Sequence, residues 1–558
     1  MKIIKKRFRS TTSLIAGLIA CGAAAVATGP SAVDAATEAV AQESNGVVIR
    51  RLSQEQYETI IADVFGPGMK IGGRFEPVPR EEGLLAVGAA RVGLTTAGFE
   101  QYDAIARTIA AQVVDPTHRK VLIPCKPAAA NGPDDACAKQ FLASAGRLLY
   151  RRPLTDREIN LQVKAANQGA TALKDFYAGI ESSLALMLVA PQFLYRQERM
   201  EADPDNAGQM RLNGYAKASR LSFLFWNTAP DPQLLSAAES GELHTAKGLT
   251  AQVERLMASP RMEAGVRAFF TDMLGFDKFG TLAKDGSIYP KFTTHVSEDA
   301  QEQTLRTITN LLLVNRGDYR DLFTTRKTFL TPLLASVYGV PLLQNKPNGY
   351  PESWHAQEYP AGDPRAGILT HISFVSLHSH PGRTSPTIRG KAMREMIMCQ
   401  RVPDPPGNVN FTVVQDTTNP LYKTARERLT AHATEAMCTG CHKITDPLGL
   451  SLENFDSAGS YRTKENGAAL DTSGTLNAAT FKDAAGLGQA MHDSPAVSQC
   501  LVRRLSTFAL GRQTAPTESD WVKALNDGFA ADKYRLPDLM KRIATSPEFF
   551  RVKARPGA

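Results

Sequence analysis

The sequence predicts a mainly α protein built from several helical modules, and three observations support this fold class. Amphipathic patterns with apolar residues at helical spacing recur along most of the chain, while alternating strand patterns are scarce. Ser-Pro and Ala-Pro pairs repeatedly mark the place where one helix ends and the next begins. At 558 residues the chain is too long for one core, and about 150 residues per domain predicts three or four structural units.

The N-terminus, residues 1–27, is predicted to be an export signal peptide. Five Lys or Arg residues precede the apolar run SLIAGLIACGAAAVA, which is too short to span a bilayer comfortably and ends in small residues. Two processing sites stay open: an A-x-A site at Ala25–Ala27, and a lipobox that would place a lipid on Cys21. Residues 28–46, rich in Ala, Ser and Thr, are predicted to be a tether.

The net charge gives no reason to expect a nucleic-acid partner. The formal charge is +8, but the signal peptide holds five basic residues and no acidic ones, so removing it leaves +3. No other segment approaches 18 consecutive apolar residues. A lipid on Cys21 is therefore the only membrane attachment that the sequence offers.

The first helical module is predicted at 47–120. The stretch RLSQEQYETIIADVFG at 51–66 has apolar residues at helical spacing, and Ser53 ahead of acidic and amide residues is an N-cap signal. A second helix pattern follows at 99–114. The loop at 115–137, rich in Pro and Gly, ends the module.

Four further modules follow along the chain. They are predicted at 138–200, 208–340, 362–475 and 480–555. The polar stretches EADPDNAGQM, LQNKPNGYPESWHAQEYPAGD and VPDPPGNVNFTVVQDTTNPLYK interrupt the helix patterns. The strongest helix patterns in this part lie at 139–152, 173–189, 212–227, 253–274, 298–315 and 499–512.

The module at 362–475 contains the pentapeptide Cys438-Thr439-Gly440-Cys441-His442, which is the CxxCH signature of covalent haem c attachment. Two thiols add across the vinyl groups of the porphyrin, and the adjacent histidine becomes the proximal iron ligand. We therefore predict one covalent haem c held by Cys438, Cys441 and His442. Structural zinc would need two more ligands, such as His432 with Cys399 or Cys500, and a CxxC redox pair would lack its βαβ context.

The surroundings of the predicted iron are less defined by sequence. Pro447 in KITDPLG is either the residue whose carbonyl accepts the proximal imidazole N–H or a simple turn proline. For the sixth ligand, Met491 follows His442 by 49 residues, but its pattern is that of a helical core residue. The distal side therefore stays open between electron transfer and reaction with a substrate.

A polar loop, SLHSHPGRTSPTIRG, supplies the other candidates for the distal side. His380 is the preferred distal ligand or active-site group, and His378 is a weaker candidate. Arg383 and Arg389 could pair with haem propionates or an anionic substrate. His380, Arg383 and Arg389 are therefore the candidate catalytic residues.

Four cysteines remain in the exported chain, and they permit three pairings. Cys125 and Cys137 flank a short loop and could form a local disulfide. Cys399 and Cys500 would then close a loop of about 100 residues around the CxxCH segment. The alternative is four free, buried thiols, which an oxidising compartment disfavours.

Long motifs follow one another along the mature chain. They are RLSQEQYETIIADVFG, FLASAGRLLYRRPLTDREI, SLALMLVAPQFLYRQE, LNGYAKASRLSFLFWNTAPDPQLL, RAGILTHISFVSLHSHPGRTSPTIRGKAMRE, CTGCHKITDPLGLSLENFDSAGSYR and CLVRRLSTFALGR. Together they resemble the multi-domain secreted cytochrome-c-like proteins of the domain-of-unknown-function 1592 family, with the associated domains 1587, 1595, 1588 and 1585.

The resemblance implies a cytochrome-c-like haem unit followed by a C-terminal helical module. It carries over Cys438, Cys441 and His442 as haem residues, and His380 as part of an SHPxRTSPxxRG motif. It also supports the pairing of Cys399 with Cys500. It implies no reaction, and because a separate cytochrome module before the first domain is lacking, the chain is expected to carry one haem.

Two functions follow as expectations for a periplasmic or cell-envelope protein. The first is electron transfer to or from a redox partner protein, which the lack of an obvious acid–base pair favours. The second is a haem-dependent oxidative enzyme acting on peroxide, oxygen or an organic substrate, small or polymeric. The size of the helical body favours the second. A scaffold with a structural haem is the weakest of the three hypotheses.

Overall fold

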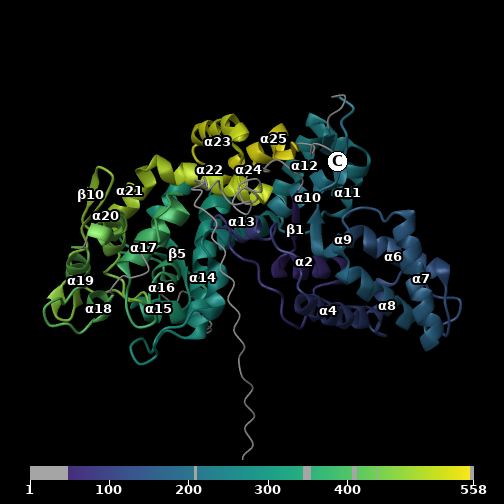
Figure 1. Cartoon of the computed structure of the whole chain (residues 1–558), viewed down its shortest axis with the longest axis horizontal. Helices are drawn as coiled ribbons and strands as arrows, with labels where there is room; N and C mark the ends of the chain where they lie inside the picture. Colours follow the sequence, from purple (N-terminus) through teal and green to yellow (C-terminus); the bar gives the residue numbers. More distant parts are fainter. Residues whose placement is uncertain (1–47, 206–209, 343–352, 405–410, 435, 553–558) are drawn as a thin grey trace, which may run out of the picture. The chain divides into compact units, whose positions relative to one another are not determined.

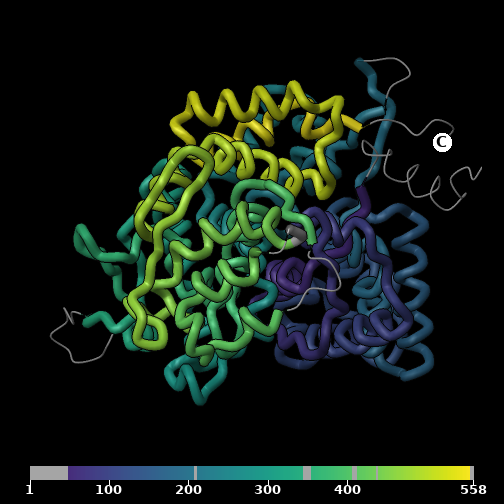
Figure 2. Tube along the Cα trace, turned by 60° about the vertical axis from the view of Figure 1, so that its left-hand side comes forward, coloured from purple at the N-terminus to yellow at the C-terminus, as the bar shows by residue number. Residues whose placement is uncertain are grey.

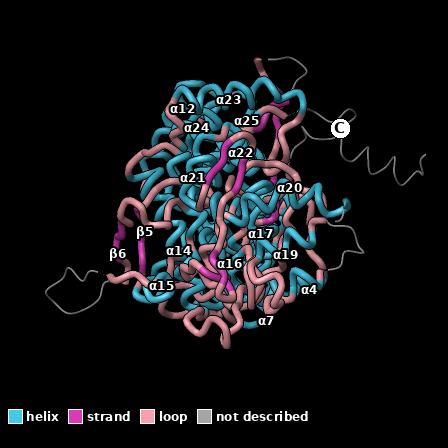
Figure 3. Tube along the Cα trace, turned by 90° about the vertical axis from the view of Figure 1, so that its left-hand side faces the viewer, coloured by secondary structure: helices cyan, strands magenta, loops and turns pink. Residues whose placement is uncertain are grey.

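The computed structural model describes residues 48–205, 210–342, 353–404, 411–434 and 436–552, and they are mainly α-helical (Figure 1). The expected signal peptide (1–27), tether (28–46) and Cys21 lie outside the described residues. Strands in the described part of the chain form only two-stranded antiparallel ladders, and Figure 3 shows them as short magenta segments among cyan helices. The predicted fold class, mainly α with several helical modules, is confirmed.

The N-terminal part begins with β1 (Ile49–Arg51) and α2 (Gln54–Phe65). Ser53 caps α2 in a capping box with Gln56, as the sequence signal predicts. The elements that follow are α3 (Leu85–Gly88), α4 (Thr96–Val114), α5 (Arg119–Leu122), α6 (Asp135–Leu149), α7 (Asp156–Leu173), α8 (Phe176–Val189), α9 (Pro191–Leu194) and β2 (Tyr195–Gln197).

The modules expected at 47–120 and 138–200 share one hydrophobic core rather than folding around separate ones. Apolar residues of α2, α4, α6 and α8 meet in a single buried cluster that includes Tyr57, Ile109 and Phe141. Strand β1 pairs antiparallel with β2, with Ile49 opposite Gln197. The start of the first module is therefore paired with the end of the second. The pairing joins residues about 150 positions apart, which local patterns do not reveal.

The central part combines α-helices with short 3-10 and π segments and four short strands. Its elements are β3 (Met200–Ala202), β4 (Met210–Leu212), α10 (Gly214–Phe225), α11 (Pro232–Glu239), η1 (Glu242–His244), α12 (Ala246–Ala258), α13 (Met262–Met273), η2 (Phe276–Thr281), α14 (Thr294–Thr309), η3 (Asn310–Val314), η4 (Tyr319–Phe323), β5 (Lys327–Leu330), α15 (Pro332–Tyr338) and β6 (His355–Glu358). Apolar side chains from these elements, the CxxCH module and the C-terminal helices form the second core. The described chain therefore has two cores.

The part that contains CxxCH has shorter helices and two hairpins. Its elements are η5 (Ile368–Thr370), α16 (Ile372–Leu377), α17 (Pro386–Ala392), η6 (Met393–Ile397), α18 (Thr412–Gln415), α19 (Ala425–His432), α20 (Ala436–Leu450), β7 (Lys464–Glu465), β8 (Ala468–Ala469), β9 (Gly474–Leu476) and β10 (Ala479–Phe481). Figure 2 traces the chain from these green segments into the yellow C-terminal helices. Those are α21 (Ala484–Asp493), α22 (Pro495–Leu510), η7 (Pro516–Glu518), α23 (Ser519–Ala531), α24 (Leu536–Thr545) and α25 (Pro547–Phe550).

Most of the prolines that were expected to begin a helix do so. Pro191, Pro495 and Pro547 occupy the first turn of α9, α22 and α25. Pro260 differs, because it lies in a turn and α13 begins two residues later. Only Ser546 caps its helix with a side-chain bond to Glu548 N, whereas Ser494 makes none at the start of α22.

Helices α17 and α20 approach each other through two glycines, which fixes the CxxCH helix against the polar-loop motif. A Cβ at Gly449 would lie 1.7 Å from the Pro386 carbonyl oxygen, and one at Gly390 would lie 2.0 Å from that of Thr445. Any larger residue at either position would force the helices apart. The start of α17, directly after the SHPGRTSP motif, is therefore held against the C-terminal half of α20.

Two disulfides staple the described chain. Cys125 bonds to Cys137, and Cys399 bonds to Cys500, which ties the end of η6 to α22. These are the two pairs expected from the sequence. No helix in the described part of the chain is long and apolar enough to cross a bilayer.

Candidate haem site

The three residues expected to hold haem lie in the first turns of α20. Positions 438, 441 and 442 are separated by three and four residues, so they share one face of a helix. Both thiols are free; Cys438 is 6% exposed, and Cys441 is half-buried with Sγ 3.9 Å from the Pro403 carbonyl oxygen. The helix therefore presents two thiols and one imidazole together.

The His442 imidazole is oriented by a carboxylate. His442 Nδ1 lies 2.7 Å from Asp446 Oδ2, one helical turn further along α20. The Thr387 hydroxyl of α17 and the Thr445 hydroxyl donate to the other oxygen of Asp446 at 2.9 and 3.2 Å. Because Nδ1 faces the carboxylate, Nε2 on the opposite edge of the ring is the nitrogen left for a metal.

Pro447 does not take the place that the sequence suggested for it. It lies inside α20 rather than in a turn, and the partner of the His442 ring is the Asp446 side chain rather than the Pro447 carbonyl. The signal was present in the sequence as a carboxylate four residues after the histidine. That spacing places both side chains on one face once the segment is recognised as a helix.

A second histidine lies against the first. The rings of His432, the last residue of α19, and His442 have centroids 5.1 Å apart and planes at 80°. Phe411 packs on His432 at 5.9 Å with nearly parallel rings. His432 is 8% exposed. From the sequence, His432 was a candidate only as a zinc ligand. Its closeness to His442 could not be predicted, because it depends on how the chain turns between α19 and α20.

The zinc alternative loses the two cysteines that were proposed as further ligands. Cys399 and Cys500, named as possible partners of the CxxC pair, are bonded to each other. Among the described residues, no three His, Cys, Asp or Glu side chains converge in a geometry that would hold a metal ion. The donor set that is present, two adjacent free thiols with a neighbouring oriented imidazole, fits covalent haem.

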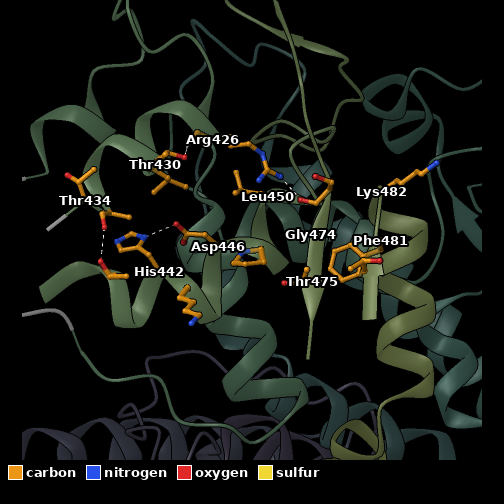
Figure 4. A pocket seen from close by; sticks show the side chains of 17 residues that line it. Arg426, Thr430, Thr434, His442, Asp446, Leu450, Gly474, Thr475, Phe481 and Lys482 are labelled. Atoms are coloured by element: carbon orange, nitrogen blue, oxygen red, sulfur yellow. Dashed lines mark hydrogen bonds and ion pairs between the residues drawn. The ribbon is translucent and has the colours of Figure 1, made fainter. Parts of the chain in front are cut away.

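A pocket of about 850 Å³ lies beside His442, with both Thr434 and Asp446 in its wall (Figure 4). This volume is within the range of roughly 300–1,000 Å³ that is common for small-molecule and cofactor sites. Its lining includes His442 and Asp446 but neither thiol. Helices α19 and α20 and the β9–β10 hairpin supply basic, hydroxyl and apolar side chains, among them Arg426, Lys443, Lys482, Thr430, Thr434, Thr439, Thr475, Thr480, Leu429, Leu450 and Phe481.

Arg389, one of the candidate catalytic residues, is used inside the fold. Its guanidinium is 0% exposed and donates to five groups of the chain. They are the carbonyls of Leu452, Phe455, Val375 and Asp456 and the carboxylate of Glu453. Burial lowers the pKa of Arg389 to about 10, although Glu453 opposes this shift. Arg389 therefore anchors α17 to the segment after α20, and its catalytic role stays a prediction.

The His380 loop is built around a buried lysine that sequence analysis missed. Lys284 Nζ donates to the carbonyls of Ser376, Ser379 and His380 at 2.7, 3.2 and 3.2 Å. Burial lowers the pKa of Lys284 to about 7. The His380 carbonyl also accepts from the Ser457 hydroxyl at 2.5 Å. Nothing in the local sequence pairs Lys284 with a loop more than 90 residues away.

Burial disfavours the charged form of both histidines in this loop. His378 is buried against Phe374, and burial, reinforced by nearby basic groups, lowers its pKa to about 3. Burial also lowers the pKa of His380, with Arg383 and Lys284 adding to the shift. The roles of His380 and Arg383 at an iron or substrate stay predictions.

Met491 lies where its pattern indicated. Its side chain is 0% exposed on α21 and belongs to the second core. A core methionine of this kind fills space between helices.

The fold and this site define a multi-domain helical protein with a cytochrome-like domain. Five family models, each described as a protein of unknown function, match successive parts of the chain: DUF1587 at 50–115, DUF1595 at 137–198, DUF1592 at 212–340, DUF1588 at 365–465 and DUF1585 at 477–549. The DUF1588 model, named PSCyt3, is the cytochrome-like one, and it spans CxxCH.

The chain therefore belongs to the DUF1592 family of multi-domain proteins, together with its companion domains. Each matched range overlaps one of the five modules expected from sequence. No curated protein and no solved structure matches the chain.

Proposed function

We propose that the protein is an exported mono-haem c-type cytochrome protein that transfers electrons to or from a periplasmic partner. The observation that carries the proposal is the first part of α20, where free Cys438 and Cys441 share a face with His442. The DUF1588 match over the same segment supports a cytochrome-like unit.

Each residue of the site has a part in this function. Cys438 and Cys441 would bind the haem covalently, and His442 would bind its iron through Nε2. When bound, haem supplies a one-electron iron couple. Asp446 would fix the tautomer of His442 and strengthen the imidazole as a ligand, which would favour the oxidised iron.

Export to the periplasm or cell envelope is supported by the signal-like N-terminus and by the two disulfides. A lipid on Cys21 would anchor the protein to a membrane surface, while cleavage after Ala27 would release it. A redox partner protein would exchange electrons with the haem, and we propose no nucleic-acid partner.

A second candidate function is supported by the pocket beside His442. A cavity of about 850 Å³ with Arg426, Lys443 and Lys482 at its wall suits a small anionic substrate or part of a polymer. In that case the protein would be a haem-dependent oxidative enzyme. The distal position at the iron would then be open or easily displaced.

The test is covalent haem content after periplasmic expression with the c-type maturation machinery. We expect one haem on the wild type and none on Cys438→Ala/Cys441→Ala, measured by intact mass and by haem-stained denaturing gels. Thr439→Ser, between the two cysteines, is the matched control and should keep its haem. Covalent haem on the double variant would contradict the site.

Carbon monoxide binding by the reduced protein separates the two functions. An electron-transfer protein with two axial ligands resists carbon monoxide, whereas an oxidative enzyme binds it readily.

A further inference from the structure

We propose that His432 is the second axial ligand of the haem iron, opposite His442. The proposal rests on the proposed function, because it presupposes haem at Cys438, Cys441 and His442. It makes the iron six-coordinate through two imidazoles, which suits electron transfer.

The first support is contact. The His432 and His442 ring centroids are 5.1 Å apart, with nearly perpendicular planes at 80°. A metal bound by two imidazoles has bonds of about 2 Å to each and places the ring centroids roughly 6 Å apart. The rings therefore need to separate by only about 1 Å, and perpendicular planes are compatible with ligands on one axis.

The second support is the orientation of His442. Its Nδ1 is occupied by Asp446, so Nε2 points away from that carboxylate. Figure 4 shows the ring between Asp446 on one side and the end of α19, near Thr434, on the other. The same end of α19 carries His432. The metal-binding edge of His442 is thus directed toward the segment that holds His432.

The third support is that His432 is held in place. Thr424 and Glu427 form a capping box at the start of α19, and Arg428 pairs with Glu465 at 2.6 Å. Phe411 covers one face of the His432 ring. At the other end of the turn, the Thr439 hydroxyl donates to the Ala433 carbonyl at 2.8 Å and links α19 to α20. A ring on a capped, braced helix is pre-organised for ligation.

The other sixth-ligand candidates are placed less well. Met491 is buried in the core formed with the C-terminal helices. His380 makes its described contacts with Lys284 and Ser457, through its carbonyl oxygen. His432 is the candidate whose ring touches that of the proximal histidine.

The experiment compares wild type with His432→Ala and His432→Met, each matured with covalent haem. We expect a low-spin ferric wild type by absorption and electron paramagnetic resonance spectroscopy. His432→Ala should become high-spin and bind carbon monoxide when reduced, and added imidazole should restore the low-spin spectrum. His432→Met should have a histidine–methionine spectrum and a higher potential. His295→Ala, on an exposed histidine, is the control and should behave as wild type.

Several results would overturn the assignment. They are a high-spin wild type, a low-spin spectrum that survives in both His432 variants, and an open site created by His380→Ala instead. In each of these cases covalent haem is still present, so the haem site at Cys438, Cys441 and His442 stands. A high-spin wild type would in addition favour the oxidative enzyme over electron transfer. Absence of covalent haem from the wild type would overturn the proposed function and this assignment together.

Discussion

Two segments of the same module carry paired histidines, and the fold treats them differently. In the α19–α20 segment, the ring of His442 is bonded to a carboxylate and touches the ring of His432. In the loop between α16 and α17, backbone carbonyls take most of the bonds, from the ammonium of Lys284 and the guanidinium of Arg389. In the first segment the described interactions are made by side-chain rings and a carboxylate. In the second they are made mainly to backbone carbonyls.

The difference shows that a long, recognisable motif can be held in place mainly through its backbone. SHPGRTSP attracts attention because many of its residues are specified, yet its described hydrogen bonds join it to Lys284, Glu453 and Ser457. Its Pro386 carbonyl packs against Gly449 of α20. The residues proposed to hold haem sit on α20, and Thr387 of α17 supports them by donating to Asp446. Removing parts of the loop should therefore cost stability, and removing parts of α19–α20 should change redox behaviour.

The largest expected effect comes from Gly449→Ala. The new Cβ would lie 1.7 Å from the Pro386 carbonyl oxygen, so α17 and α20 cannot keep their crossing. We expect a loss of about 4 kcal/mol or more in the free energy of unfolding, or no folded protein. Urea unfolding followed by circular dichroism measures it.

Gly440→Ala is the matched control on the same helix, because nothing lies within 4 Å of its added Cβ. It should be neutral or slightly stabilising, since Ala favours a helix over Gly by about 1 kcal/mol. Equal stability of the Gly449 and Gly440 variants would contradict the close crossing.

Arg389→Met should come next. The substitution leaves the Glu453 carboxylate buried with only Arg462 as a charged partner, and four carbonyls lose a donor. Breaking a buried pair of this kind typically costs about 3–5 kcal/mol. Thermal unfolding of the purified variant checks this value. A variant as stable as wild type that loses only redox activity would instead assign Arg389 a direct role at the iron.

Acid should destabilise the scaffold through its neutral histidines. Burial lowers the pKa of His371 and of His378 from 6.5 to about 3. Between pH 6.5 and 3 the unfolded chain binds protons that the folded chain does not, so stability falls as pH falls. The slope is up to about 1.4 kcal/mol per pH unit for each histidine.

His378→Gln should flatten this dependence while leaving covalent haem content unchanged. Unfolding free energies at pH 4, 5, 6 and 7 measure the slope. An unaltered slope in the variant would show that His378 is not one of the groups responsible.

The smallest expected effect, and the one confined to redox behaviour, is that of Asp446→Asn. The amide is a weaker partner for His442 Nδ1, so the imidazole would be a weaker ligand and the oxidised iron would lose stabilisation. The reduction potential should rise by tens of millivolts, where about 60 mV is a tenfold change for one electron. Spectroelectrochemical titration gives the value.

Asp493→Asn serves as the control for that measurement, because it removes the carboxylate bonded to a different histidine, His492. Its potential should equal that of wild type. A similar shift in both variants would indicate a general charge effect rather than tuning of the proximal ligand.

The haem hypothesis for α20 could be formed from the sequence because the pattern behind it is local. CxxCH requires only neighbouring residues on one helical turn, and Asp446 was also readable at four residues from His442. The position of His432 was not predictable, because it depends on how α19 folds back on α20. The role of Lys284 was not predictable for a similar reason, since its carbonyl partners lie more than 90 residues away in the sequence.

The same difference between local and distant interactions decided which parts of the fold were predictable. Helix patterns, the Ser53 cap and most proline starts were local and predictable. The merging of two N-terminal modules into one core was not, because it depends on the β1–β2 pairing and on helix packing between distant segments.

The central claim is that the α19–α20 segment is the redox centre, and anomalous X-ray diffraction from crystals of the matured protein tests it most directly. Data collected at the iron and zinc edges locate each metal independently of the fold. The account predicts one iron peak about 2 Å from His442 Nε2 and no zinc peak beside Cys438 and Cys441. A zinc peak held by Cys438, Cys441 and His442, or iron elsewhere in the chain, would contradict it.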